Sequence, residues 1–240
     1  EEAFVRGVDA VADRHALFAS ADFQSRVVDY LDAQHARAPI DMVTFDVFDT
    51  VVLRNHKCEP RRFWEIAQRQ ASLLIAEGQM SGAVGAIGAD LFVARIMATR
   101  VSYRVRRPVH GCREGSITDI YQGMVGSLGL DSSYVERLLD IEIEYEVEST
   151  TRNPLALCIA HWGDRAGART GLVSDMYLHA PHIERIVTAH LQEDRAMFGS
   201  LVSSADTVIS RGSGRLFDQL AEKHGIEAGA HLHFGDNVRT

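Results

Sequence analysis

Four short apolar runs, each followed directly by polar residues, are the feature of this 240-residue chain that most constrains its fold. The runs cover residues 40–45, 170–173, 201–202 and 231–234. They alternate with stretches of helical periodicity, which is the pattern of a parallel sheet covered by helices. Open sheets of this kind bind ligands at the carboxyl ends of their strands. The sequence therefore predicts a Rossmann-like α/β core with a site at one edge of its sheet.

A long stretch with helical periodicity separates the first of these runs from the second. Phe63, Ile66 and Leu74 keep the i, i+3, i+4 spacing of a helix with one buried face. Further helices are expected over residues 91–107, 116–128 and from Ser133 onward. Ser133 opens the last one with the Ser-x-x-Glu spacing of a capping box. The glycine-rich stretch 82–88 is expected to be a flexible loop, because no strand precedes it as a nucleotide-binding loop would require.

These patterns predict three parts. An N-terminal helical segment covers residues 1–38, an α/β core covers residues 39–58 and 166–240, and an all-helical cap covers residues 59–165. The N-terminal segment has two apolar faces, Phe4, Val8 and Val11 on one and Phe23, Val27 and Leu31 on the other. The cap is thus inserted after the first strand of the core.

Composition narrows the possible settings of the chain. A net charge of -8 disfavours a nucleic-acid surface, which needs clustered Lys and Arg. Three scattered cysteines indicate reduced thiols, and no apolar run approaches the roughly 20 residues of a membrane span. With no basic leader visible, we expect a cytoplasmic location. A start without Met and an abrupt end at Thr240 suggest a piece of a longer protein.

Four polar groups at or near the strand ends suit phosphoryl transfer. Asp46 follows the first run, Ser174 the second and Asp236 the last, while Arg211 precedes a predicted helix over residues 214–224. Phosphoryl transfer needs an oxygen nucleophile, cations for the phosphoryl oxygens and a metal ion that bridges enzyme and substrate.

Taken in order, these pieces resemble the four motifs of the haloacid-dehalogenase (HAD) superfamily of hydrolases. The resemblance implies a magnesium-dependent phosphohydrolase that acts on a small phosphorylated metabolite through an aspartyl-phosphate on Asp46. Asp46, Ser174 and Arg211 would be catalytic. Thr50, Ser174, Asp175 and Arg211 would bind the substrate. Mg²⁺ would be held by Asp46, the backbone carbonyl of Phe48 and Asp236, since hard oxygen ligands suit that ion.

Two departures from the family pattern leave alternatives open. The family usually has Lys in its third motif, and here Arg211 is the first choice and Arg215 the second. Arginine keeps the charge but changes the geometry. Most HAD phosphatases also carry an Asp acid/base two residues after the nucleophile, where this chain has Phe48. Asp49 is one residue away, which usually turns a side chain to the other face, and Asp175 is another conceivable acid.

The aromatic residue at position 48 resembles the metal-free dehalogenase branch, in which the Asp attacks carbon. Residues 45–54, 173–178 and 235–237 together resemble predicted bacterial HAD hydrolases that are fused to, or encoded beside, glycosyltransferases of surface-polysaccharide systems. That resemblance implies a fused or neighbouring glycosyltransferase as partner. It also implies a third alternative, a non-catalytic HAD module attached to such an enzyme.

Two other patterns admit a functional interpretation. His231 and His233 share a strand face and could bind metal, although no third ligand lies nearby in the sequence and an ordinary core or surface role is favoured. Arg100, Arg104 and Arg107 share a helix face, for which a solvated surface is favoured over substrate recognition in the cleft.

Overall fold

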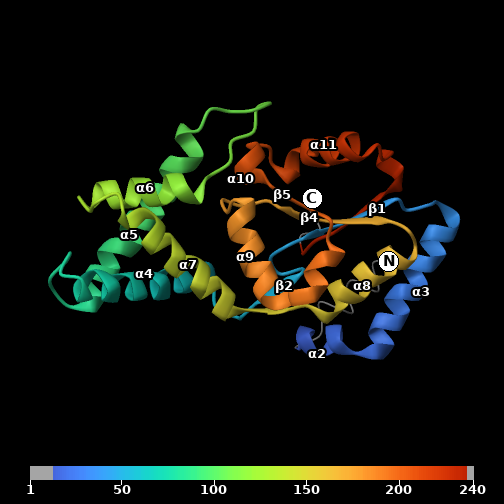
Figure 1. Cartoon of the computed structure of the whole chain (residues 1–240), viewed down its shortest axis with the longest axis horizontal. Coiled ribbons are helices and arrows are strands. Elements are labelled where there is room, and N and C mark those ends of the chain that lie inside the picture. The colour runs from blue at the N-terminus through green and yellow to red at the C-terminus, as the bar shows by residue number, and fades with distance from the viewer. Residues whose placement is uncertain (1–12, 237–240) are drawn as a thin grey trace.

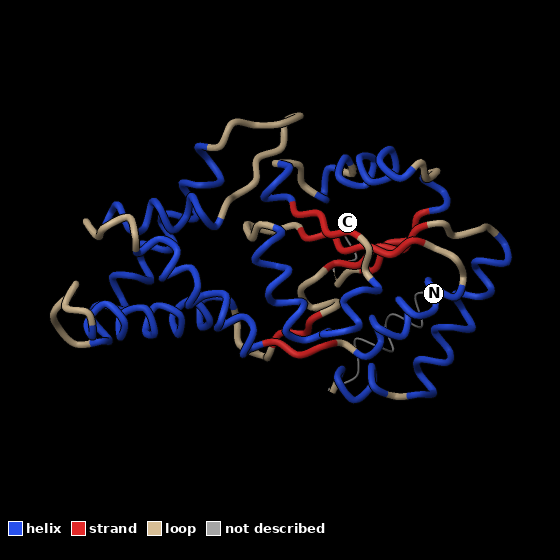
Figure 2. Tube along the Cα trace, viewed as in Figure 1, coloured by secondary structure: helices blue, strands red, loops and turns tan. Residues whose placement is uncertain are grey.

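Four parallel strands form the sheet that the sequence predicts (Figures 1 and 2). In this computed structural model, which describes residues 13–236, the strands are β1 (Met42–Asp46), β4 (Arg169–Ser174), β5 (Ser200–Ser203) and β6 (His231–Phe234). Their order in the sheet is β5-β4-β1-β6. Asp46 pairs with Val173, and Ser174 with Ser203, so the carboxyl ends of these strands meet at one edge. The predicted parallel α/β core is confirmed.

Helices cover both faces of the sheet because successive strand residues point to opposite sides. On one face α8 (Pro154–Arg165) packs against β1 and β4, beside α3 (Ala21–Arg37), α9 (Ala180–Leu191) and α2 (Arg14–Ala19). On the other, Leu216 and Leu220 of α11 (Arg215–His224) pack with Met42 and Val173. Short helical turns complete the connections: η1 (Gln192–Met197), α10 (Ser204–Thr207), η2 (Arg211–Ser213) and η3 (Ala228–Ala230).

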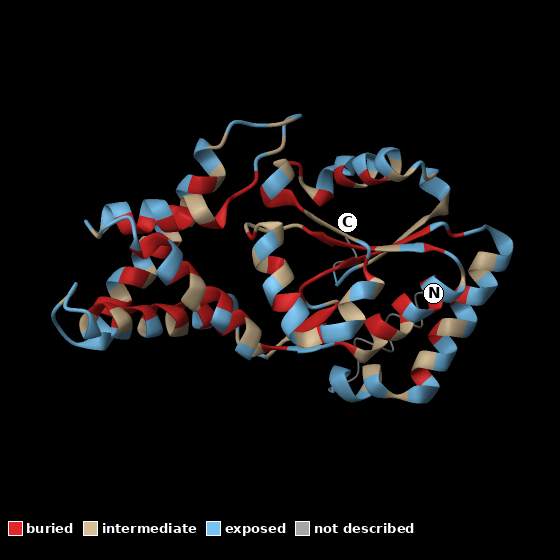
Figure 3. Ribbon diagram, viewed as in Figure 1, coloured by how far each residue is buried: buried red, intermediate tan, exposed pale blue. Residues whose placement is uncertain are grey.

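Most of the insertion between β1 and β4 forms a separate helical layer, the cap, which lies beside the sheet in Figure 1. Its helices are α4 (Glu59–Ala76), α5 (Val84–Val105), α6 (Ile117–Ser127) and α7 (Tyr134–Ser149). An antiparallel ribbon of β2 (Val52–Arg54) and β3 (Thr150–Arg152) carries the chain into the cap and back. Buried residues gather on the inner faces of both layers (Figure 3). A helical cap inserted after the first core strand is as predicted, but β3 is a strand within the stretch expected to be all helical.

Three local predictions are wrong or incomplete. Residues 84–88 are helical and not a loop. Gly88 serves helix packing there, since a Cβ at this position would lie 2.0 Å from the Gln68 Nε2 atom of α4. Ser133 forms no side-chain cap, since it adopts a helical backbone conformation and its N–H donates to Asp131. Helix α8 falls within the stretch expected to be cap, yet it packs on the sheet.

Buried polar contacts hold the cap over the strand ends. Glu142 of α7 accepts hydrogen bonds from Arg95 of α5 at 3.1 and 2.8 Å and from Tyr121 of α6 at 2.5 Å. It also accepts one at 3.1 Å from Tyr177, which lies in the loop after β4. The carbonyl of Tyr177 in turn accepts the N–H of Ile117 at 2.8 Å. The loop after β4 is thereby joined to three cap helices.

Some predictions fall outside the described residues. These are the apolar face of Phe4, Val8 and Val11, and the last residue of the Gly235-Asp236-Asn237 motif. Within residues 13–236, no helix has the length and apolar character needed to cross a bilayer.

Candidate functional site

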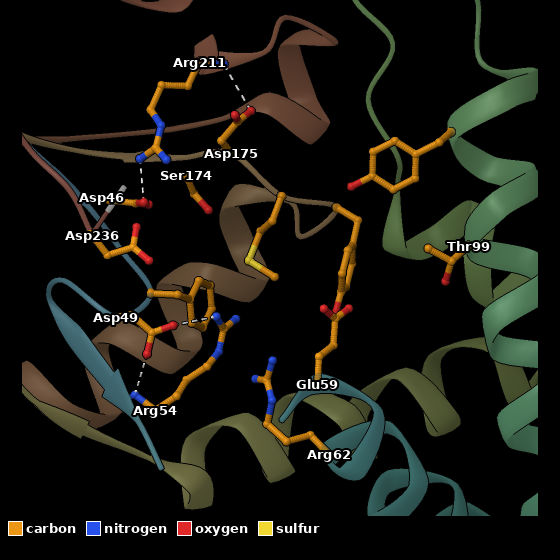
Figure 4. Close-up of a pocket in the computed structure, with 14 residues that line it drawn as sticks. Asp46, Asp49, Arg54, Glu59, Arg62, Thr99, Ser174, Asp175, Arg211 and Asp236 are labelled. Atoms are coloured by element: carbon orange, nitrogen blue, oxygen red, sulfur yellow. Dashed lines mark hydrogen bonds and ion pairs between the residues drawn. The ribbon is translucent and has the colours of Figure 1, made fainter. Parts of the chain in front are cut away.

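A cavity of about 360 Å³ lies where the carboxyl ends of the strands face the cap (Figure 4). From the core it is lined by Asp46, Phe48, Asp49, Ser174, Asp175, Met176, Tyr177, Arg211 and Asp236. From the β2 strand and the cap it is lined by Arg54, Glu59, Arg62, Thr99 and Tyr103. All the sequence-predicted site residues except Thr50 therefore meet at one place, although they come from distant parts of the chain.

Asp46 is the last residue of β1, and its carboxylate is buried at the base of the cavity. One oxygen accepts the N–H of Val47 at 2.8 Å, and the other accepts Arg211 Nη1 at 2.5 Å. Burial raises the pKa of Asp46 to about 6, an effect that Arg211 opposes and the nearby charge of Asp236 reinforces. The carboxylate is thus mostly ionised at neutral pH.

Arg211 occupies η2, just before α11, and its side chain is buried against Asp46. Its own N–H donates to Asp175 at 3.1 Å, which ties the arginine to the loop after β4. Arg215, the alternative third-motif residue, begins α11 and is exposed. Of the two arginines, only Arg211 lines the cavity.

Buried polar atoms without a partner mark a place where a ligand would be favourable. The Ser174 hydroxyl and the Arg211 Nε atom are both buried and have no hydrogen-bond partner within the described structure. Leaving such a group unpaired costs about 1–3 kcal/mol, which a ligand oxygen would offset. The Thr50 hydroxyl is also buried without a hydrogen-bond partner within the described structure, but Thr50 does not line the cavity.

Phe48 and Asp49 both line the cavity, and both contact Arg54. The Phe48 ring lies under the Arg54 guanidinium, whose central carbon is 4.1 Å from the ring centroid. Asp49 has a positive φ of 59° and accepts hydrogen bonds from the Arg54 backbone N–H and Nη1 at 3.2 and 3.1 Å. Asp49 is therefore engaged by Arg54, as Figure 4 shows.

The oxygen donors at the base of the cavity fit a hard cation. Asp46 and Asp236 supply two carboxylates, and their charges act on each other. No group of three or more His, Cys, Asp or Glu side chains that could hold a metal exists among residues 13–236. An ion here would need a backbone carbonyl, such as that of Phe48, and water. Mg²⁺ commonly binds in this way, through one or two carboxylates.

The cap contributes a wall that sequence reasoning did not identify. Glu59 and Arg62 come from α4, and Thr99 and Tyr103 come from α5. Burial raises the pKa of Tyr103 to about 12, so its hydroxyl stays protonated and can donate a hydrogen bond. Helical spacing alone could not show which face of α4 or α5 meets the strand ends.

The arginines considered for substrate recognition lie elsewhere. Arg100, Arg104 and Arg107 are exposed, and none of them lines the cavity. Thr99 and Tyr103, each one residue earlier and about 100° around the helix, line the cavity instead.

His231 and His233 both lie within hydrogen-bond distance of the Thr44 hydroxyl, at 2.8 and 2.9 Å. Burial lowers the pKa of His233 to about 4, with a further contribution from Arg211, so its ring is neutral. Its Nε2 atom lies 3.5 Å from Arg211 Nη1. These histidines are structural neighbours of the cavity base, and they show no metal-site geometry.

Comparison with known proteins gives fold-level likenesses only. No protein-family model matches the chain, and no curated protein matches its sequence. Among solved structures it is similar to the L-2-haloacid dehalogenase from Xanthobacter autotrophicus with covalently bound chloropropionic acid, at 15% identity and TM-score 0.42, covering 81% of this chain and 69% of that one. It is also similar to a predicted phosphoglycolate phosphatase from Haemophilus somnus 129PT, at 14% identity and TM-score 0.44, covering 82% and 77%. Likenesses of this strength do not place the chain in a family.

Proposed function

We propose that this chain is a magnesium-dependent phosphohydrolase of the HAD superfamily, which acts on a small phosphorylated metabolite. The observation that supports the proposal is that four residues predicted from the sequence lie around one cavity. Asp46, Ser174, Arg211 and Asp236 come from four separate parts of the sequence and line one cavity at the strand ends (Figure 4). Their order along the chain is the one that the HAD resemblance implies, with Arg211 where the family usually has Lys.

Asp46 would act as the nucleophile. A bond forms between its carboxylate oxygen and phosphorus while the bond from phosphorus to the leaving oxygen breaks, which gives an aspartyl-phosphate. Water then cleaves that acyl phosphate and restores the carboxylate. Arg211, now paired with Asp46, has an unpaired Nε that can also bind a phosphoryl oxygen. Ser174 can donate its unpaired hydroxyl to another.

Asp46, the Phe48 carbonyl and Asp236 would hold Mg²⁺. When bound, the ion supplies positive charge that offsets the repulsion between a carboxylate nucleophile and a phosphate. This role is supported by the fact that both carboxylates line the same cavity. Burial raises the pKa of Asp46, which indicates that its charge lacks full compensation from the protein alone.

The rate of hydrolysis at such a site depends on whether the leaving group needs a proton. A phenyl ring at position 48 cannot protonate a departing alkoxide, and Asp49 is engaged by Arg54. The cap wall of Glu59, Thr99 and Tyr103 offers hydrogen-bonding groups to the rest of the substrate. These features favour a hydroxyl-bearing metabolite, with faster turnover where the leaving oxygen needs no proton.

The test is hydrolysis of an aryl phosphate with and without magnesium. We expect turnover that depends on added Mg²⁺, that EDTA abolishes and that Asp46→Asn reduces to background. Asp41→Asn is the matched control, because Asp41 is exposed and lies just before β1. Turnover that is indifferent to both EDTA and Asp46→Asn would overturn the proposal.

A metal-free dehalogenase is the second candidate, supported by Phe48 and by the direct Arg211–Asp46 ion pair. Here Asp46 attacks the carbon that bears the halogen, halide leaves, and water cleaves the resulting ester. Halide release from 2-chloropropionate in the presence of EDTA would favour this reaction over phosphoryl transfer. If the chain turns over neither substrate class, a non-catalytic module that accompanies a glycosyltransferase becomes the better interpretation. That partner and the cytoplasmic location stay predictions.

A further inference from the structure

The outer face of α5 carries an exposed apolar stripe. Val93, Met97, Val101 and Val105 follow each other at four-residue spacing, with exposed fractions of 58%, 54%, 51% and 70%. Side chains at this spacing lie on one side of a helix. Large apolar side chains gathered in this way indicate an interaction surface, whereas scattered ones do not. The stripe faces away from the cavity, so a partner bound there leaves the site open.

The sequence along this face is arranged symmetrically about Met97. Val93 and Val101 lie four residues before and after it, and Asp90 and Arg104 lie seven residues before and after it. Asp90 and Arg104 are exposed, and neither forms an ion pair with any residue between 13 and 236. In an antiparallel pair of identical helices crossing at Met97, each residue before the crossing faces its counterpart after it. Val93 then faces Val101 of the partner subunit, and Asp90 faces Arg104 of the partner subunit.

We propose that two copies of this chain associate through antiparallel pairing of their α5 helices about a twofold axis at Met97. A twofold interface must be complementary to itself, and this face is: two carboxylates meet two guanidiniums while the valines and Met97 pack between them. Parallel pairing would instead set Asp90 against Asp90 and Arg104 against Arg104. The complementarity therefore selects a second copy, in one orientation, as the occupant.

The length of α5 limits the area that the dimer can bury and therefore its affinity. Helix α5 has 22 residues, which corresponds to a length of about 33 Å. One helix pair of this length buries less than the roughly 1,600 Å² of a standard interface. We therefore expect a dimer that dissociates on dilution, with a dissociation constant in the range of about 1–100 µM.

Charge reversal gives a test that separates pairing from mere exposure. Sedimentation velocity should show a concentration-dependent dimer for the unmodified chain. Asp90→Arg and Arg104→Asp should each weaken it at least about tenfold, because each places like charges opposite each other twice. Mixing the two variants in equal amounts should restore a dimer, since every Arg then faces an Asp. Arg107→Asp, an exposed reversal beyond the end of α5, is the control and should leave the dimer unchanged.

Three outcomes would overturn the proposal. The unmodified chain could stay monomeric up to about 500 µM, well above the expected dissociation constant. The single reversals could leave a dimer unaffected, which would place the interface elsewhere. Alternatively, the mixture could fail to associate although each variant gives the circular dichroism spectrum of a folded protein.

Discussion

Glu114 offers a direct test of how the cap joins the core. It lies between α5 and α6, buried, and its carboxyl accepts a hydrogen bond from Ser204 of α10 at 3.2 Å. Burial raises the pKa of Glu114 to about 7; the charge of Asp175 adds to this effect, and Ser204 and Arg106 oppose it. The cap segment therefore meets the core through a carboxyl group that prefers to be protonated.

The contribution of Glu114 to the free energy of unfolding follows from its pKa values in the unfolded and folded chain. An ordinary pKa of 4.5 in the unfolded chain and about 7 in the folded chain, at about 1.4 kcal/mol for each pH unit, correspond to at most about 3.5 kcal/mol of stability. The folded state binds the proton more tightly, so this stability is fully present below pH 4.5 and is lost as the pH rises through 7. Glu114→Gln has no proton to lose, so its free energy of unfolding should escape that loss.

Urea unfolding of both proteins, followed by tryptophan fluorescence, measures the effect. The free energy of unfolding of Glu114→Gln minus that of the unmodified chain should become more positive between pH 4.5 and 8, by up to about 3.5 kcal/mol. Glu144→Gln, at an exposed position of α7, removes the same charge and should show little change with pH. A difference for Glu114→Gln that is constant with pH, or that falls as the pH rises, would refute the reasoning.

Two further predictions concern the site itself. Phe48→Asp should raise the turnover of alkyl phosphates by up to about 10²-fold, because it supplies the missing acid, while aryl phosphates should change less; equal changes for both, measured as kcat, would argue against this role. Gly235→Ala should lower turnover at least about tenfold, because its Cβ would lie 3.2 Å from His233 Nε2 and 3.5 Å from Arg211 Nη1. Gly229→Ala, where a Cβ meets nothing within 4 Å, is its control, and equal kcat values for the two variants would contradict the prediction.

The sheet could be predicted because each strand has its own local signal. Residues such as Val43 and Phe45 are β-branched or aromatic, and polar residues end each run. The ribbon of β2 and β3 was not predicted, since three-residue strands such as Val52–Arg54 are too short to show alternation. The glycines at residues 82–88 were interpreted as a loop, but Gly88 allows α5 to pack closely against α4. No local sequence pattern reveals such close packing between two helices.

The site was predictable where it sits on strand ends and unpredictable where the cap supplies it. Asp46, Ser174 and Asp236 follow apolar runs, and parallel topology brings such positions together. Glu59 and Tyr103 come from helices whose orientation over the sheet depends on contacts distant in sequence, such as that of Tyr177 with Glu142. Helical periodicity identifies a buried face but does not say what it is buried against.

The charges around the cavity bear on the choice between the two candidate reactions. Five carboxylates line it, Asp46, Asp49, Glu59, Asp175 and Asp236, against three guanidiniums, Arg54, Arg62 and Arg211. With all of these groups ionised, the lining carries a charge of 3 − 5 = −2. A phosphate or a haloacid carboxylate is itself negative, so the bare cavity repels both. Arg54 and Arg62 are moreover paired with Asp49 and Glu146, which leaves Arg211 to offset the charge at the base. A divalent cation between Asp46 and Asp236 would neutralise the lining where the substrate anion binds. A metal-free reaction would have to overcome this repulsion with Arg211 alone, and this charge balance is the reason for proposing the magnesium-dependent reaction first.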